Sequence, residues 1–157
     1  MDSEDPTTLL NLGTVSYGLG REEDALHWFK KLPEKNEQIE KWVYELEETM
    51  ILKNNPRKWM KFLLLRVEHN VQREESLLDI VNLFNTSDDD QLLLAKAIIH
   101  EDITEKVNTI NLLINSCYEN GLYDKAIALL ETTLKYGGEP SEVTKLIQAI
   151  KTNYLNL

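Results

Sequence analysis

Four turn signals recur along the chain at almost equal intervals. Gly20, Asn54, Ser87 and Gly121 are separated by 34, 33 and 34 residues, and each lies between two segments with helical periodicity. Independent helices have no reason to keep a common spacing, so the interval predicts repeated helical hairpins. A hairpin of this size cannot bury its apolar face alone, and neighbouring hairpins are therefore expected to stack and share a core.

The hydrophobic pattern predicts about nine helices and no strand, because no segment alternates polar and apolar residues for long enough. The prediction is a single all-α domain, residues 1–157, in which αα-hairpins form a superhelical solenoid. The four expected hairpin units and a final capping helix span about residues 6–33, 36–69, 72–100, 102–136 and 140–155.

Local signals predict where helices begin and which faces are buried. Asp5 followed by Pro6 is typical of a helix start, and Asp102 three residues before Glu105 has the spacing of a reciprocal N-terminal cap. The periodicity also predicts two buried faces that can be tested directly. These faces consist of Leu9, Leu12, Val15 and Ser16 on the first helix, and of Leu77, Leu78, Val81 and Phe84 on the fifth.

The first hairpin, residues 9–33, carries the most specific pattern. Leu12-Gly13, the aromatic Tyr17, Gly20, Ala25 and Phe29 follow one another at fixed steps. This pattern resembles the tetratricopeptide repeat, a family of helical hairpins about 34 residues long. The resemblance returns in residues 107–140, whereas the units between match by period only. The second match is carried by Leu113, Tyr118, Gly121, Tyr123, Ala126 and Leu130.

The resemblance implies a binding function, because members of the tetratricopeptide family hold an extended peptide or a partner helix in a concave groove. The first helix of each hairpin lines that groove. In the last matching unit the groove-facing positions are Asn108, Asn111, Asn115 and Glu119, which share one helix face. Asparagine amides both donate and accept, so this face suits a peptide backbone. Plain solvent exposure explains the same pattern, and both interpretations stay open.

The acidic charge limits the expected partners. The net charge is −10, and residues 1–50 hold 12 acidic and 5 basic residues. Such a surface repels nucleic acid and anionic lipid, so we expect neither nucleic acid nor membrane as a partner, and it steers a basic protein or peptide. A role in solubility alone is the alternative. No apolar run is long enough to span a bilayer and the N-terminus does not resemble a signal peptide, so a cytoplasmic location is expected.

We expect no catalytic residue, no metal ligand and no cofactor. The single cysteine, Cys117, excludes an internal disulfide, and its position favours a small core residue over a nucleophile. The three histidines, His27, His69 and His100, lack metal-ligand spacing. The acids at residues 88–90 are better explained by the favourable field at a helix N-terminus than by a cation site.

One basic cluster interrupts the acidic composition. Its five members are separated by no acid and enclose two aromatic residues, Trp59 and Phe62. A solvated helix face with inward-pointing aromatics explains the cluster most simply. A phosphate or nucleic-acid patch and pairing with the acidic helix at residues 37–48 are the alternatives. The members are Lys53, Arg57, Lys58, Lys61 and Arg66.

These observations favour a non-catalytic protein- or peptide-binding scaffold or adaptor that uses the concave face of stacked hairpins. A peptide-sensing regulatory domain of a larger regulator is one alternative. An accessory repeat domain of a larger enzyme, such as a glycosyltransferase, is another. Association of the chain with itself also stays open.

Overall fold

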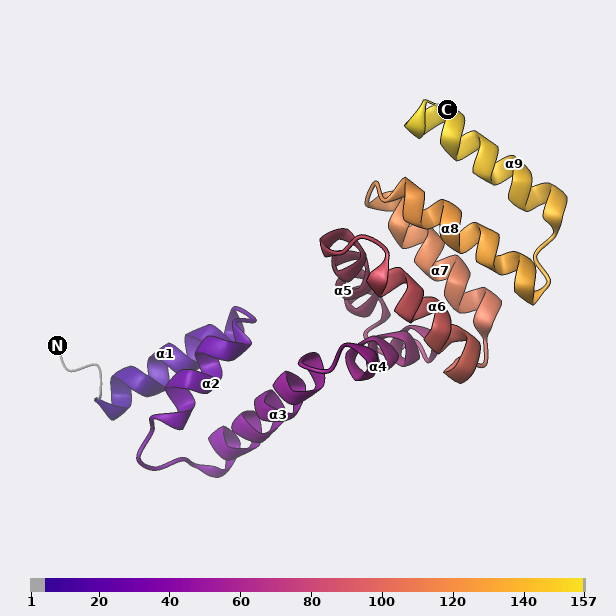
Figure 1. The fold of residues 1–157 in the computed structure, drawn as a ribbon. Coiled ribbons are helices and arrows are strands. Elements are labelled where there is room, and N and C mark those ends of the chain that lie inside the picture. The colour runs from indigo at the N-terminus through magenta and orange to yellow at the C-terminus, as the bar shows by residue number, and fades with distance from the viewer. Residues whose placement is uncertain (1–4, 157) are drawn as a thin grey trace. The chain divides into compact units, whose positions relative to one another are not determined.

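The computed structural model describes residues 5–156, and within that range the chain forms helices and no strand (Figure 1). This confirms the predicted all-α class and the expectation of about nine helices. The α-helices are α1 Pro6–Gly18, α2 Glu22–Lys30, α3 Glu37–Lys53, α4 Pro56–Glu68, α5 Arg73–Thr86, α6 Asp90–Asp102, α7 Lys106–Glu119, α8 Tyr123–Thr133 and α9 Pro140–Ile150. A 3₁₀ turn, η1 Leu134–Tyr136, extends α8, and a π turn, η2 Lys151–Leu155, extends α9.

The chain divides into two compact units, Met1–Pro56 and Arg57–Leu157. The first contains α1 to α3 and the second contains α4 to α9, and each buries its own hydrophobic cluster. The division falls between α3 and α4, inside the hairpin expected at residues 36–69. The arrangement of four hairpins as one solenoid stays a prediction.

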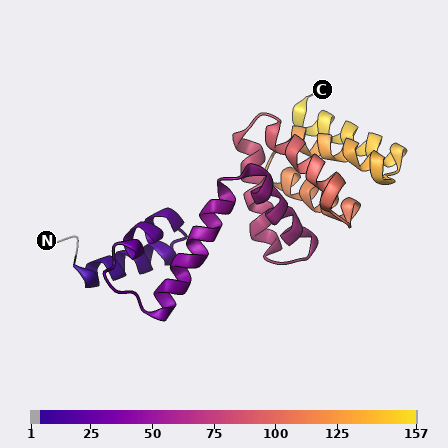
Figure 2. The same cartoon turned by 60° about the horizontal axis from the view of Figure 1, so that its bottom comes forward.

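The core of the first unit depends on a close approach between α1 and α2. These helices lie against each other (Figure 2), and a Cβ atom placed on Gly13 would come within 2.4 Å of the Phe29 ring. Gly13 therefore faces α2. The predicted burial of Leu12 and Val15 is wrong, because their exposed fractions are 37% and 58%. The buried residues of α1 are Leu9, Gly13 and Ser16.

This close approach predicts opposite effects for two glycines of the same helix. Gly13→Ala should lower the free energy of unfolding by roughly 1–3 kcal/mol, because the new methyl group overlaps the fully buried Phe29 ring. Gly18→Ala should leave it unchanged or raise it by up to about 1 kcal/mol, since no heavy atom lies within 4 Å of a Cβ at that position. Urea denaturation followed by circular dichroism measures both. Equal effects for the two variants would contradict the assigned helix contact.

The core of the second unit is larger and draws on α4 to α9. Helix α5 contributes Leu77, Val81 and Phe84, as predicted. The predicted burial of Leu78 is wrong, because that side chain is 51% exposed and Ser76 and Ile80 face the core instead. A helical stripe centred on 77, 80, 81 and 84 leaves position 78 outside the buried face.

Three turns between helices share one backbone geometry. Gly20, Asn70 and Gly121 each adopt a left-handed conformation, with φ of +74°, +56° and +76°. In each turn, the amide of the next residue donates to a carbonyl five residues earlier, over 2.8–2.9 Å. This pattern is the Schellman ending of a helix, which glycine and asparagine favour. Asn54 and Ser87 do not adopt it: Asn54 stays in the right-handed helical region and Ser87 is extended.

A glutamate from α4 caps the start of α7. The carboxylate of Glu68 accepts from the backbone amides of Thr104 at 2.7 Å and of Glu105 at 2.9 Å. The predicted reciprocal cap of Asp102 with Glu105 is wrong, because Asp102 is the last residue of α6 and the Glu105 side chain makes no capping hydrogen bond. The tertiary contact replaces the local one, and it brings a negative charge to the positive end of the α7 dipole.

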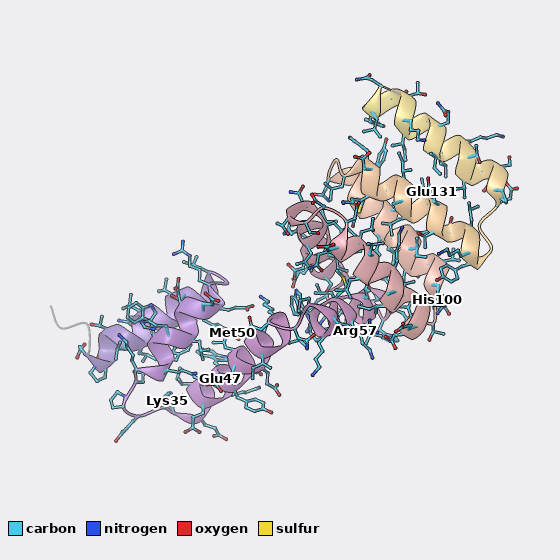
Figure 3. The ribbon with its side chains drawn as sticks, viewed as in Figure 1. Lys35, Glu47, Met50, Arg57, His100 and Glu131 are labelled. Carbon is cyan, nitrogen blue, oxygen red and sulfur yellow. The ribbon has the colours of Figure 1, made fainter. Side chains whose placement is uncertain are left out.

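Removal of this carboxylate should destabilise the second unit. Glu68→Ala leaves two amides at the start of α7 without their acceptor, and we expect a loss of about 1–2 kcal/mol in the free energy of unfolding. Glu131→Ala is the matched control, because Glu131 is an exposed acid of α8 (Figure 3) that forms no hydrogen bond or ion pair within residues 5–156. Thermal denaturation of both variants measures the difference. Equal melting temperatures for the Glu68→Ala and Glu131→Ala proteins would overturn the capping role.

Candidate binding groove on helices α7 and α9

Helix α7 presents one apolar face and one polar face. The apolar face is buried and includes Ile110, Leu113 and Cys117, whose side chains are fully enclosed. All four predicted site residues lie on the exposed side of the helix, and their side chains form no hydrogen bond or ion pair within the described residues. These residues are Asn108, Asn111, Asn115 and Glu119.

A groove of about 300 Å³ runs between α7 and α9, with α8 contributing to its wall. In Figure 1 these three helices lie side by side. Ile114, Asn115 and Tyr118 line the α7 side, and Leu130 comes from α8. Helix α9 and η2 supply the opposite wall, which consists of Leu146, Ala149, Ile150, Asn153 and Tyr154. No charged side chain of the described residues lines the groove.

Two tyrosines that line the groove, Tyr118 and Tyr154, form a cluster with Tyr123. Tyr123 stacks on Tyr154 with ring centroids 4.4 Å apart, and the ring of Tyr118 stands edge-on to both. The hydroxyls of Tyr118 and Tyr154 form a hydrogen bond of 2.5 Å. This hydrogen bond, helped by partial desolvation and by the neighbouring tyrosine charges, raises the pKa of Tyr118 above its ordinary value of 10.0.

The raised pKa gives a test of the tyrosine cluster. Tyr154→Phe removes the hydroxyl partner, so the pKa of Tyr118 should fall toward its ordinary value. A raised pKa in the folded state favours the neutral phenol, so this contribution to stability is present below about pH 10 and is lost as pH rises through the folded-state pKa. Titration of the tyrosine Cζ resonances by NMR measures the shift.

Tyr44 provides the internal control for that titration. Its pKa is also raised, because its hydroxyl hydrogen-bonds to Glu48 on α3 in the other unit. The Tyr44 titration should therefore be the same in wild type and in Tyr154→Phe. A Tyr118 titration that does not respond to Tyr154→Phe would show that the hydroxyl pair is absent in solution.

The structure brings only one of the four predicted residues, Asn115, into the groove. Asn108, Asn111 and Glu119 continue along the same helix face outside it. Sequence reasoning missed the α9 wall, because residues 140–155 were expected only to form a capping helix. The spacing of Leu146, Ala149 and Asn153 by three and four residues was the available signal, and Leu146 is 53% exposed.

Acidic residues of α6 neutralise part of the basic cluster. The Arg57 guanidinium lies 2.7 Å from a Glu101 carboxylate oxygen and 3.5 Å from one of Asp102, and Lys61 lies 3.8 Å from Asp102. Arg66 stacks over the Phe62 ring at 4.2 Å. The expectation of inward-pointing aromatics holds in part, since Trp59 and Phe62 are half-buried and pack against the core. The acidic partners of Arg57 and Lys61 come from α6, not from the helix at residues 37–48.

The other residues considered for chemistry lie in the core or take part in local ion pairs. Cys117 is fully buried, and burial raises the pKa of its thiol to about 12, so the reactive thiolate is scarce at neutral pH. The Lys125 ammonium contacts the Asp88 carbonyl and pairs with the Asp89 carboxylate at 2.9 Å. Within residues 5–156, no three His, Cys, Asp or Glu side chains gather in a way that could hold a metal ion.

Comparisons with family models, with curated proteins and with solved structures gave no significant match to this chain. The resemblance to the tetratricopeptide repeat therefore stays an interpretation of the sequence. None of the described helices combines the length and the apolar character that crossing a membrane requires.

Proposed function

We propose that this chain is a non-catalytic protein-binding module and that the groove between α7 and α9 holds a segment of its partner. The observation that supports the proposal is the composition of the groove. Exposed apolar side chains and two asparagine amides line one cavity, and charged groups are absent from its described walls. Pockets that bind ligands typically combine apolar walls with a few polar groups that fix orientation.

The size and chemistry of the groove favour an uncharged, extended peptide segment. A volume of about 300 Å³ is at the lower end of the range for small-molecule sites, roughly 300–1,000 Å³, and suits one or two large side chains. Leu146 and Ile150 offer apolar contact for an aliphatic or aromatic anchor. Asn115 and Asn153 offer donors and acceptors to the peptide backbone beside it.

The polar face of α7 extends the recognition surface beyond the groove. Asn108 and Asn111 precede Asn115 on the same exposed face, so a bound segment that runs along α7 meets successive amides. Glu119 adds a negative charge beyond Asn115. A basic residue in the partner, outside the apolar anchor, fits this charge and the acidity of the whole chain.

Selection of peptides on the wild-type chain tests the proposal. Peptides enriched from a random display library should carry a large apolar residue, and their affinity can be measured by fluorescence polarisation. Asn111→Ala combined with Asn115→Ala should weaken binding roughly tenfold, because each lost hydrogen bond costs about 0.5–1.5 kcal/mol. Leu146→Asp should weaken it at least as much, because it places a charge in the apolar wall.

Gln148→Ala is the matched control, because Gln148 is an exposed amide of α9 that does not line the groove. Its peptide affinity should stay within about twofold of wild type. Circular dichroism of each variant verifies that the helices are intact. Peptides that bind all four proteins equally would rule out this groove as the recognition site.

A further inference from the structure

A second cavity, of about 310 Å³, lies between α6 and the end of α8 and has a different chemistry. Lys96, His100 and Glu101 reach it from α6, and Lys135 and Tyr136 reach it from η1. Figure 3 labels His100 on α6 and Arg57 on α4. None of these residues lines the groove between α7 and α9, so this cavity is a separate feature of the second unit.

The charges around this cavity do not cancel. Lys96 and Lys135 form no ion pair or hydrogen bond within the described part of the chain, although the protein has ten more acidic than basic residues. The acid in the wall, Glu101, is already paired with Arg57 at 2.7 Å. Two unpaired ammonium groups in one cavity of an acidic protein leave a local excess of positive charge.

His100, held by Tyr136, adds a neutral donor to these charges. Nδ1 of His100 lies 2.9 Å from the Tyr136 hydroxyl. When the hydroxyl donates to Nδ1, the imidazole carries its proton on Nε2, and that N–H is free to donate to a ligand. The ring orientation is held by the tyrosine, so the donor is positioned before any ligand arrives.

We propose that this cavity binds the phosphate group of a phosphate monoester. Lys96 and Lys135 supply two compact point charges, which match the near-double negative charge of a phosphate monoester better than the single charge of a carboxylate. The imidazole N–H of His100 donates to the third oxygen. The cavity exceeds the size of the phosphate group itself, so part of the organic group that carries it fits there as well.

NMR titration of the imidazole and backbone resonances of wild-type protein tests this site at fixed pH. Phenyl phosphate should shift His100 and its neighbours saturably, and benzoate, which presents a carboxylate on the same ring, should bind at least tenfold more weakly. A phosphoserine peptide and glucose 6-phosphate then distinguish two sources of the same group, a modified protein and a free metabolite. Whichever binds more tightly identifies the source.

Lysine substitutions locate the binding. Lys96→Gln combined with Lys135→Gln should weaken phenyl phosphate binding about tenfold or more. Lys145→Gln combined with Lys151→Gln removes the same total charge from α9 and η2, outside the cavity, and should change the affinity by less than twofold. Equal losses for the two pairs, the absence of a saturable shift, or equal binding of benzoate would each overturn the proposal.

Discussion

The turns that follow α1, α4 and α7 each depend on a residue that accepts a left-handed backbone conformation. Gly20 and Gly121 do so because they lack a Cβ atom, and Asn70 does so because asparagine tolerates this region better than other residues. The turn ends the helix, and its amides donate hydrogen bonds to carbonyls at the helix end that have no partner within the helix. In the first hairpin a third glycine, Gly13, then lets the Phe29 ring sit against the backbone of α1.

The sequence predicted those parts of the fold that local chemistry controls. Asp5 caps α1 with Pro6 at its first position, and Pro140 begins α9. The equal spacing of turn residues did not correspond to equal turn geometry. Asn54 is right-handed helical and Ser87 is extended, and both conformations are open to residues other than glycine. The spacing of turn residues reports the lengths of the helices and connections. The backbone conformation of a turn depends instead on which helix carbonyl accepts a hydrogen bond from the amide after the turn residue.

The candidate site was predictable along one helix and not across two. Periodicity places Asn108, Asn111, Asn115 and Glu119 on one face of α7, and the structure leaves all four exposed. The groove beside Asn115 forms only where α9 packs beside α8. The side chains that line it come from three helices that are separated along the chain, so periodicity within one helix cannot predict it. The same limit explains Glu68, which caps a helix that begins 38 residues later, and Arg57, whose carboxylate partners lie on α6.

The overall acidity and a local cationic cavity are compatible because charge acts over a limited range. At physiological ionic strength the Debye length is about 8 Å, so acids on distant helices are largely screened from a ligand in the α6 cavity. Lys96 and Lys135 line that cavity and act on such a ligand at contact distance. The uncharged groove between α7 and α9 is governed instead by apolar area and by hydrogen bonds, which salt screens little. The two proposed sites of the second unit therefore differ in chemistry, because one is lined by two lysines and the other by no charged side chain among the described residues.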